Sequence, residues 1–186
     1  MSGYAAVFID GGYLDYVLKG QFAQARIDYA ALTRAMAGND ELMRAYYYHC
    51  LPYQASPPTE AEKARFASMQ SFCNRLRRLD RFEVRLGKLA YRGLDAVGHP
   101  IFEQKRVDSM LAVDLVLLAA KRSIRKAVLF TGDSDFLPAV WTAKNEGVIV
   151  GLWHGTGAMQ PHKDLWDAMD ERTPVTEALI NTMRRP

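Results

Sequence analysis

The sequence predicts an α/β fold, a three-layer domain built around a central, mainly parallel sheet. Short apolar runs recur along the chain, and segments with helical periodicity separate them. These runs lack the alternation of polar and apolar residues that a sheet with one wet face shows, so both faces of each strand are expected to be buried. Strands that alternate with helices in this way are joined by crossover helices, which cover the two faces of a parallel sheet.

The first third of the chain is expected to form a strand, a helix and a second strand. Residues 4–10 are a near-continuous apolar run that ends at a Gly-Gly pair, where we expect a tight turn. Residues 27–36 have helical character. Residues 42–51 are rich in Tyr and end before Pro52, which favours a strand.

The middle of the chain predicts a long helix followed by a hairpin. Between residues 59 and 80, apolar side chains recur at spacings of three and four, as an amphipathic helix requires. These side chains are Phe66, Met69, Phe72, Cys73 and Leu76. Residues 82–89 are expected to form a strand, and residues 93–100 a turn that leads to a short strand at 101–103.

The last third predicts two further strands, each preceded by a helix. Residues 108–121 are helical and so apolar that we expect this helix to be largely buried. Residues 127–131 form another apolar strand. A helix at 136–145, stopped by Gly147, then precedes a strand at 148–153. A loop and one or two short helices complete the chain.

The composition is that of one globular domain. At 186 residues, with 49% hydrophobic residues, the chain can build one sizeable core. We expect a single domain over residues 1–186, with its core at 4–153 and a helical extension at 154–186. Cys50 and Cys73 are too few for a disulfide framework and lack the clustered spacing of a zinc site.

The location of the protein is predicted from its apolar segments. The first apolar run meets Asp10 before a signal-peptide core could form, and no uninterrupted apolar stretch of about 18 residues follows. We therefore expect a cytoplasmic protein that does not enter a membrane.

Acidic residues follow two of the expected strands. Asp10 ends the first strand, and Asp133 and Asp135 come directly after the strand at 127–131. Ligands of open α/β sheets collect at the carboxyl ends of the strands. If these two strands are neighbours, three carboxylates converge there, and Asp108 at the start of a helix can complete the group.

Carboxylates gathered in this way repel one another unless a cation lies among them. Oxygen ligands without Cys or His favour Mg²⁺ or Mn²⁺. Such an ion lowers the pKa of a water molecule and supports phosphodiester hydrolysis. Any one of these aspartates alone is better explained as a turn residue or helix N-cap, and residues 132–135 are a good turn sequence. Their joint occurrence favours the site.

Three separated motifs resemble the bacterial NYN family of PIN-like nucleases. They are FIDGG at the first strand, QKRVDSMLAVDL in the middle and LFTGDSDFLPAV later, in the order and spacing of that family. The resemblance covers residues 8–140. It implies a PIN-like sheet of strand order 3-2-1-4-5, divalent-metal endoribonuclease activity, and metal-site carboxylates at Asp10, Asp108, Asp133 and Asp135.

The chain departs from the family pattern at two positions. Tyr13 stands where the family often has Asn, which removes one polar group beside Asp10. Arg106 replaces the Gly of the usual Lys-Gly-Val-Asp and adds a cation beside Asp108. These departures motivate the alternative of a catalytically weakened PIN-like module that binds RNA or a protein partner. A phosphatase of the haloacid-dehalogenase type is disfavoured, because no second aspartate lies two residues after Asp10.

Further polar residues are candidates for supporting roles. Asp114 is six residues, or roughly 240°, around the helix from Asp108, so the two cannot share a face. Asp114 is therefore expected either to support the site from outside the ligand set or to form a buried hydrogen bond. Thr131 and Ser134 could orient a carboxylate or water, although turn hydroxyls more often bond local backbone. His154 and His162 follow the last strand and could face the site, although solvent-facing loop histidines are the commoner case.

Basic residues concentrate between residues 75 and 106, where nine Lys and Arg stand against four Asp and Glu, a net +5 compared with +3 for the whole chain. This concentration suits contact with RNA phosphates, for which we name Lys105, Arg106, Lys88 and Arg92. Tyr91 and Phe102 could stack on bases. Tyr46, Tyr47 and Tyr48, or the C-terminal helices, could support a homodimer, but aromatic strand residues are more often core.

Overall fold

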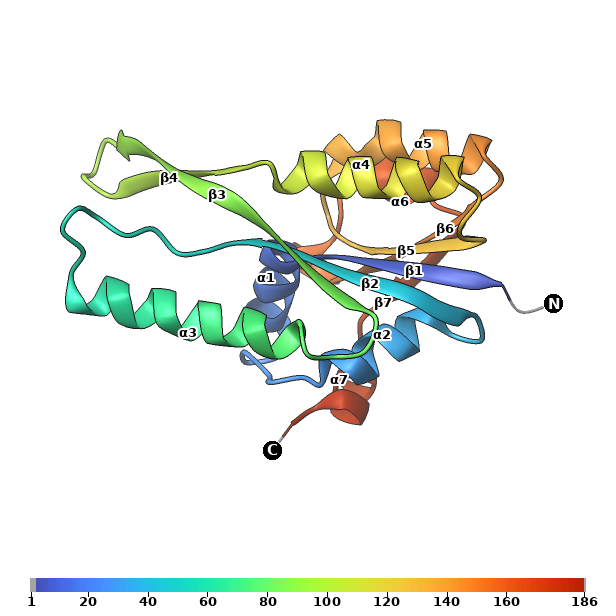
Figure 1. Cartoon of the computed structure of the whole chain (residues 1–186), viewed down its shortest axis with the longest axis horizontal. Coiled ribbons are helices and arrows are strands. Elements are labelled where there is room, and N and C mark those ends of the chain that lie inside the picture. Colours follow the sequence, from blue (N-terminus) through green and yellow to red (C-terminus); the bar gives the residue numbers. More distant parts are fainter. Residues whose placement is uncertain (1–2, 186) are drawn as a thin grey trace.

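The computed structural model describes residues 3–185, apart from the side chain of Gln104. A seven-stranded sheet forms the middle layer, and helices cover both of its faces (Figure 1). The strands are β1 Tyr4–Asp10, β2 Glu41–Cys50, β3 Phe82–Leu94, β4 Pro100–Lys105, β5 Lys126–Phe130, β6 Ile149–His154 and β7 Glu171–Pro174. Every pairing is parallel except that of β3 with β4. The expected α/β fold is confirmed.

The helices divide between the two faces. One face carries α4 Val107–Ala120, α5 Leu137–Asn145 and α6 Lys163–Ala168. The other carries α1 Gly11–Gln21, α2 Tyr29–Ala37, α3 Glu60–Leu76 and α7 Glu177–Met183. Two 3₁₀ turns, η1 Ser134–Phe136 and η2 Gly157–Met159, lie in loops. Two hydrophobic cores result, one on each side of the sheet.

The strand order corrects the expectation of five strands in the order 3-2-1-4-5. The observed order is β4-β3-β2-β1-β5-β6-β7. The hairpin strand β4 extends one edge and pairs antiparallel with β3, while β7 extends the other edge. Both β4 and β7 are edge strands, paired on one side only among the described strands. Neither has the continuous apolar run by which the inner strands are recognised.

Strand β1 lies in the centre of the sheet and is the most deeply buried. Ala5 to Ile9 have no exposed surface. Ala6 and Phe8 belong to the core beneath α4 and α5, whereas Val7 and Ile9 belong to the core beneath α1 and α2. The apolar run without polar alternation thus reflects burial on both faces.

Helix α1 corrects the expected tight turn after β1. Asp10 ends the strand and caps the helix, which begins at Gly11 without an intervening loop. A Cβ on Gly11 would lie 2.5 Å from the rings of Tyr47 and His49. The glycine is therefore needed for a close approach of α1 to β2, and not for a turn.

Helix α4 is less buried than its composition predicts. Leu111 and Leu115 face the sheet and are fully buried, but Val113 is 62% exposed and Leu117 45% exposed. A helix packed on a sheet covers only one of its sides. The apolar outer side of α4 is therefore open in this chain.

The C-terminal segment contributes more than the helical extension expected at 154–186. It adds β7, whose four residues pair in parallel with β6. Asp170, just before β7, accepts a hydrogen bond from the amide of Val150 at 2.8 Å and pairs with Lys144 at 2.8 Å. No helix among the described residues is both long and apolar enough to cross a membrane.

Candidate metal centre

The candidate site lies at the carboxyl ends of β1 and β5, and these two strands are neighbours, which is the condition for the expected convergence of the carboxylates. Ile9 pairs with Phe130, so Asp10 and Thr131 come next on adjacent strands. The Thr131 hydroxyl donates to Asp10 Oδ2 over 3.3 Å and accepts from the Asp133 amide over 3.3 Å. Thr131 is fully buried, so one hydroxyl joins the ends of the two strands.

Asp10 is held in place by the helix that it caps. Its Oδ1 accepts a hydrogen bond from the amide of Tyr13 at 3.1 Å. Burial raises the pKa of Asp10 above its ordinary value, and the hydrogen bonds from Tyr13 and Thr131 offset only part of that effect. Among the described residues Asp10 forms no ion pair. A cation beside this carboxylate would therefore stabilise its charged form, which burial disfavours.

Asp133 and Asp135 lie in the turn that follows β5. Asp133 caps the 3₁₀ turn η1, and its Oδ1 accepts from the amide of Asp135 at 2.9 Å. The N-cap interpretation of Asp133 and that of Asp10 are both correct, but each cap leaves the carboxylate at the strand end. The Ser134 hydroxyl makes no hydrogen bond to another described residue.

Asp108 reaches the same place from the first turn of α4. Burial is the main cause that raises the pKa of Asp108, and repulsion from Asp133, Asp10 and Asp135 adds to it. The four carboxylates thus share one electrostatic environment, although they come from three separate segments.

This donor set fits a hard divalent cation by its chemistry. Within the part of the chain that the structure describes, no three Asp, Glu, His or Cys side chains already stand at the spacing of a closed metal site. The carboxylates of Asp108 and Asp135 accept no hydrogen bond and form no ion pair with a described residue, so no such contact fixes these two side chains. An ion would relieve the repulsion that the structure records.

Asp114 lies away from this group. Its Oδ2 accepts from the Tyr48 hydroxyl at 2.9 Å and from Arg85 Nε at 3.4 Å. These contacts link α4 to β2 and β3, and they agree with the interpretation of Asp114 as a hydrogen-bonding residue that ties the helix to the sheet.

The four predicted phosphate-binding cations lie along the β3–β4 hairpin and its junction with α4. Lys88 and Lys105 are paired across the two strands. Arg92 and Lys105 both contact Glu103, whereas Lys88 and Arg106 have no ion pair among the described residues. The hairpin extends past the ends of β1 and β5 (Figure 1). Lys105 and Arg106 are three and two residues before Asp108 in the chain, at the junction of the hairpin with α4.

The aromatic residues of the hairpin form a cluster with the segment after β2. The rings of Tyr53, Tyr91 and Phe102 lie 5.1 to 6.0 Å apart. Tyr91 and Phe102 remain substantially exposed. Tyr53 is the member of this cluster that sequence reasoning missed.

Tyr13 has a role that its sequence position did not suggest. Its hydroxyl donates to the carbonyl of Met159 at 2.6 Å and accepts from the amide of Gly155 at 3.2 Å. Burial raises the pKa of Tyr13 to about 12. Its ring packs near Phe130 and closes the space at Gly132, where a Cβ would meet it at 2.5 Å. Tyr13 therefore anchors the loop after β6 beside the candidate site.

His49 is a second residue that sequence reasoning missed. It follows Tyr48, the β2 partner of Asp10, and its Nε2 lies 3.1 Å from Asp15 Oδ2. Burial alone would lower the pKa of His49, but the hydrogen bond and attraction to Asp15 raise it overall. The only sequence signal was a histidine near the end of a strand beside the first aspartate.

The two histidines after β6 behave differently from each other. His154 is buried at the end of β6, which corrects the expectation of a solvent-facing residue. His162 is exposed and caps α6, and its amide donates to the carbonyl of Gly132 at 2.9 Å. A hydrogen bond between backbone groups, and not an imidazole, therefore connects the segment after β6 to the turn that carries Asp133.

Comparisons with known proteins give a family and a fold. The family model described as "NYN domain" matches residues 4–173. The protein y4oD of Sinorhizobium fredii (strain NBRC 101917 / NGR234), described as uncharacterized, is 34% identical over 86 residues. That match covers 45% of this chain and 36% of y4oD, so the chain spans about a third of that relative.

A solved structure agrees with the fold along nearly the whole chain. It is the crystal structure of VPA0982 from Vibrio parahaemolyticus RIMD 2210633, described as a protein of unknown function. The TM-score is 0.65 at 18% sequence identity, with 95% of this chain and 94% of that chain covered. At this identity the likeness concerns the fold alone.

Proposed function

This chain belongs to the NYN domain family, and we propose that it is a divalent-metal-dependent endoribonuclease that hydrolyses RNA phosphodiester bonds. The family is PIN-like and nuclease-like in general. The observation that carries the finer proposal is the grouping of Asp10, Asp108, Asp133 and Asp135 at the carboxyl ends of β1 and β5. Burial and, after it, repulsion from the other three carboxylates raise the pKa of Asp108.

The four carboxylates form two pairs, which differ in whether a hydrogen bond from the backbone fixes the side chain. Asp10 and Asp133, fixed by their capping hydrogen bonds, would provide rigid ligands. The carboxylates of Asp108 and Asp135, which accept no hydrogen bond from a described residue, would adjust to the ion and to substrate. Mg²⁺ or Mn²⁺, when bound, lowers the pKa of water and stabilises charge on the attacking and leaving oxygens. Thr131 keeps the carboxylate of Asp10 oriented by donating a hydrogen bond from its hydroxyl.

RNA is proposed as the substrate because of the hairpin beside the carboxylates. Lys88 and Arg106 lack ion pairs among the described residues and are available to phosphates. Lys105 and Arg92 both form an ion pair with Glu103. Each of these cations can leave that carboxylate and bind a phosphate in its place. The half-exposed rings of Tyr91 and Phe102 offer stacking surfaces for unpaired bases.

A catalytically weakened module that binds RNA or a protein partner is the second candidate. The observation that favours it is the occupied hydroxyl of Tyr13, which contacts Met159 and Gly155 and not the carboxylates. This candidate predicts RNA binding without metal-stimulated cleavage.

The proposal is tested by cleavage of single-stranded RNA and tRNA with Mn²⁺, with Mg²⁺ and with a chelator. The parent is expected to cleave only with metal. Asp10→Asn and Asp133→Asn should lose at least about a hundredfold in rate, while Asp164→Asn, an exposed aspartate of α6, should cleave like the parent. If Asp10→Asn and Asp133→Asn cleave as fast as the parent, the assignment is wrong.

A further inference from the structure

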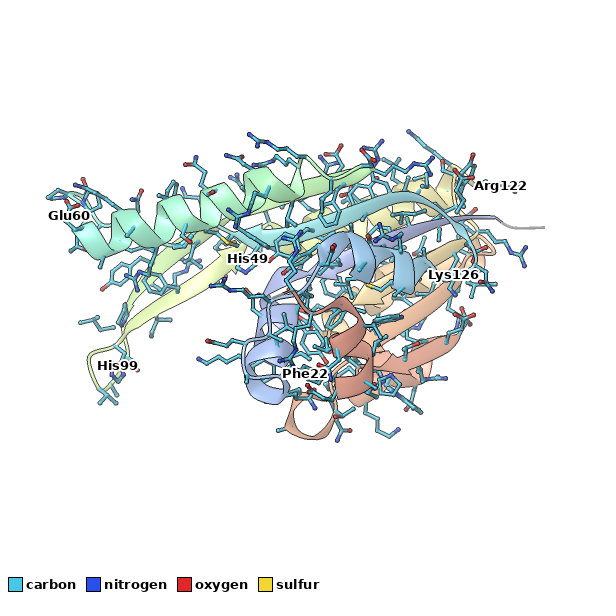
Figure 2. All side chains as sticks on the ribbon, turned by 90° about the horizontal axis from the view of Figure 1, so that it is seen from below. Phe22, His49, Glu60, His99, Arg122 and Lys126 are labelled. Carbon is cyan, nitrogen blue, oxygen red and sulfur yellow. The ribbon has the colours of Figure 1, made fainter. Side chains whose placement is uncertain are left out.

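An open cleft of about 870 Å³ lies on the sheet face that carries α1, α2 and α3, which is turned to the viewer in Figure 2. Its walls come from the second half of α1, the segment between α1 and α2, the second half of α3, and Arg185 near the C-terminus. The volume is within the range of pockets that hold small organic ligands. None of the four aspartates of the candidate metal centre lines the cleft, so the proposed phosphodiester chemistry leaves it without a role.

The hydrophobic core on this side of the sheet reaches the surface at the cleft. Leu18, Ile27 and Leu76 are buried residues of that core, and they belong to the lining. Partly buried apolar residues that pack against the same core complete the apolar lining, namely Ala25, Tyr29, Met69, Phe72 and Leu79. Apolar surface therefore contacts solvent here, and a ligand with an apolar body would remove it from water.

The arrangement of this lining favours an aliphatic body over a planar one. Tyr29, Tyr47 and Phe72 pack directly on one another, with ring centroids 5.4 to 5.7 Å apart. These rings form one wall and leave no slot for a further ring among them. The other apolar side chains of the lining are aliphatic, and the flexible thioether of Met69 adapts to irregular shapes. An unbranched hydrocarbon chain fits such a surface.

The rim of the cleft is cationic. It holds four exposed basic residues from four separate segments, and none of them forms an ion pair within the part of the chain that the structure describes. They are Lys19, Arg26, Arg75 and Arg185. The two acidic residues of the lining are already engaged. Asp15 contacts His49, and Asp28 accepts hydrogen bonds from two amides in the first turn of α2.

A backbone contact brings two of these cations together from distant parts of the chain. The amide of Arg185 donates a hydrogen bond to the carbonyl of Arg26 over 2.8 Å, and both residues line the cleft. Like charges at neighbouring positions repel each other. An anionic group bound at the rim would relieve this repulsion, as a cation would among the four aspartates.

From these features we propose that the cleft binds a small amphipathic anion, which is a molecule with an unbranched aliphatic chain and a carboxylate or phosphate group at one end. The aliphatic chain lies on the apolar lining, and the anionic group lies among the cations of the rim. Bound in this way, the ligand covers the place where the core reaches the surface. The site is separate from the candidate metal centre and does not depend on the proposed function.

The test measures the affinity of the full chain for dodecanoate and for dodecyl phosphate by isothermal titration calorimetry, below the concentrations at which these molecules form micelles. Both should bind. Hexanoate should bind more weakly than dodecanoate, by up to about fourfold for each buried methylene that it lacks. In an NMR spectrum of methyl-labelled protein, the Met69 methyl signal should shift on binding. The signal of Met110, which packs on the core of the other face, should not.

Charge reversal at the rim separates the anionic contact from the apolar one. Arg26→Glu combined with Arg75→Glu should bind dodecanoate about tenfold more weakly, because two attractive contacts become repulsive. Arg34→Glu combined with Arg65→Glu makes the same change of charge on α2 and α3 outside the lining, and it should bind like the parent. All four arginines are exposed, so thermal unfolding of both variants should resemble that of the parent.

Equal binding of dodecanoate by the rim variant and the control pair would overturn the proposal. Binding of dodecyltrimethylammonium as tight as that of dodecanoate would also overturn it, because the cleft would then select the hydrocarbon alone. Inorganic phosphate that binds as tightly as dodecyl phosphate would refute a role for the apolar lining. Binding to vesicles of phosphatidylglycerol, with none to the free molecules, would assign the surface to membranes and refute the small-ligand site.

Discussion

The hydroxyl of Thr131 donates to the carboxylate of Asp10 across 3.3 Å, from the neighbouring strand. The same hydroxyl oxygen accepts a hydrogen bond from the amide of Asp133. A single buried hydroxyl thus connects the carboxylate of Asp10 to the backbone of Asp133, and its removal should affect the position of both residues.

Thr131→Val tests this connection. Valine has nearly the same shape, but it leaves the amide of Asp133 without its acceptor and the buried carboxylate of Asp10 without its donor. We expect a loss of about 1–3 kcal/mol in the free energy of unfolding, measured with urea, together with weaker cleavage. Thr131→Ser retains the hydroxyl and should keep most of the stability and most of the cleavage rate of the parent. Equal stability of the Val and Ser variants would refute the linking role.

Asp10→Asn separates folding from metal binding. Asn is as good an N-cap as Asp, so α1 should remain capped. Because the pKa of Asp10 is raised in the folded chain, the parent loses stability as pH rises through that pKa. Without metal, the variant should therefore be at least as stable as the parent near neutral pH.

Adding Mn²⁺ should stabilise the parent but not Asp10→Asn. An ion at about 100 times its dissociation constant adds about 2.7 kcal/mol to the stability of the state that binds it. Thermal unfolding with and without Mn²⁺ measures this difference. An equal response of parent and variant would place the bound ion elsewhere.

Tyr13→Phe tests the anchoring of the loop after β6. The variant loses the hydrogen bonds to Met159 and Gly155, at an expected cost of about 1–3 kcal/mol, and residues 155–161 should become more sensitive to protease. Tyr16→Phe is the control, because its exposed hydroxyl makes one long bond, 3.3 Å, to the neighbouring carbonyl of Ala158. Indistinguishable digestion of the two variants would contradict the anchoring role.

The pair of His49 and Asp15 predicts a pH dependence. The pKa of His49 is raised in the folded chain, so its contribution to stability is complete below the ordinary value near 6.5 and is lost as pH rises through the folded value. Asp15→Asn should lower the pKa of His49 in an NMR titration. It should also destabilise the chain more at about pH 6 than at about pH 9. A destabilisation that is the same at both pH values would argue against the pair.

The inner strands and the acidic strand ends were predictable from the sequence because burial on both faces leaves an uninterrupted apolar run. Helix α1 was not, since its Gly-Gly start also suits a turn, and only the rings of Tyr47 and His49 explain Gly11. Strand β7 was missed because its four residues, three polar ones and a proline at a sheet edge, lack an apolar pattern.

The candidate site was predictable where the chemistry is local and missed where it depends on contacts between distant segments. Asp10, Asp133 and Asp135 follow strands, but the proximity of Asp108 to them depends on how α4 docks, and here the family motif supplied the link. The role of Tyr13 depends on a loop 142 to 146 residues away, which no local pattern encodes.

The central claim is that four aspartates form one divalent-metal site, and diffraction from crystals soaked in Mn²⁺ tests it most directly. We predict an anomalous peak between the ends of β1 and β5, within ligand distance of Asp10 and Asp133 and bordered by Asp108 and Asp135. The peak should vanish in Asp10→Asn crystals treated in the same way. A fully soaked parent crystal with no peak among these carboxylates would contradict the claim.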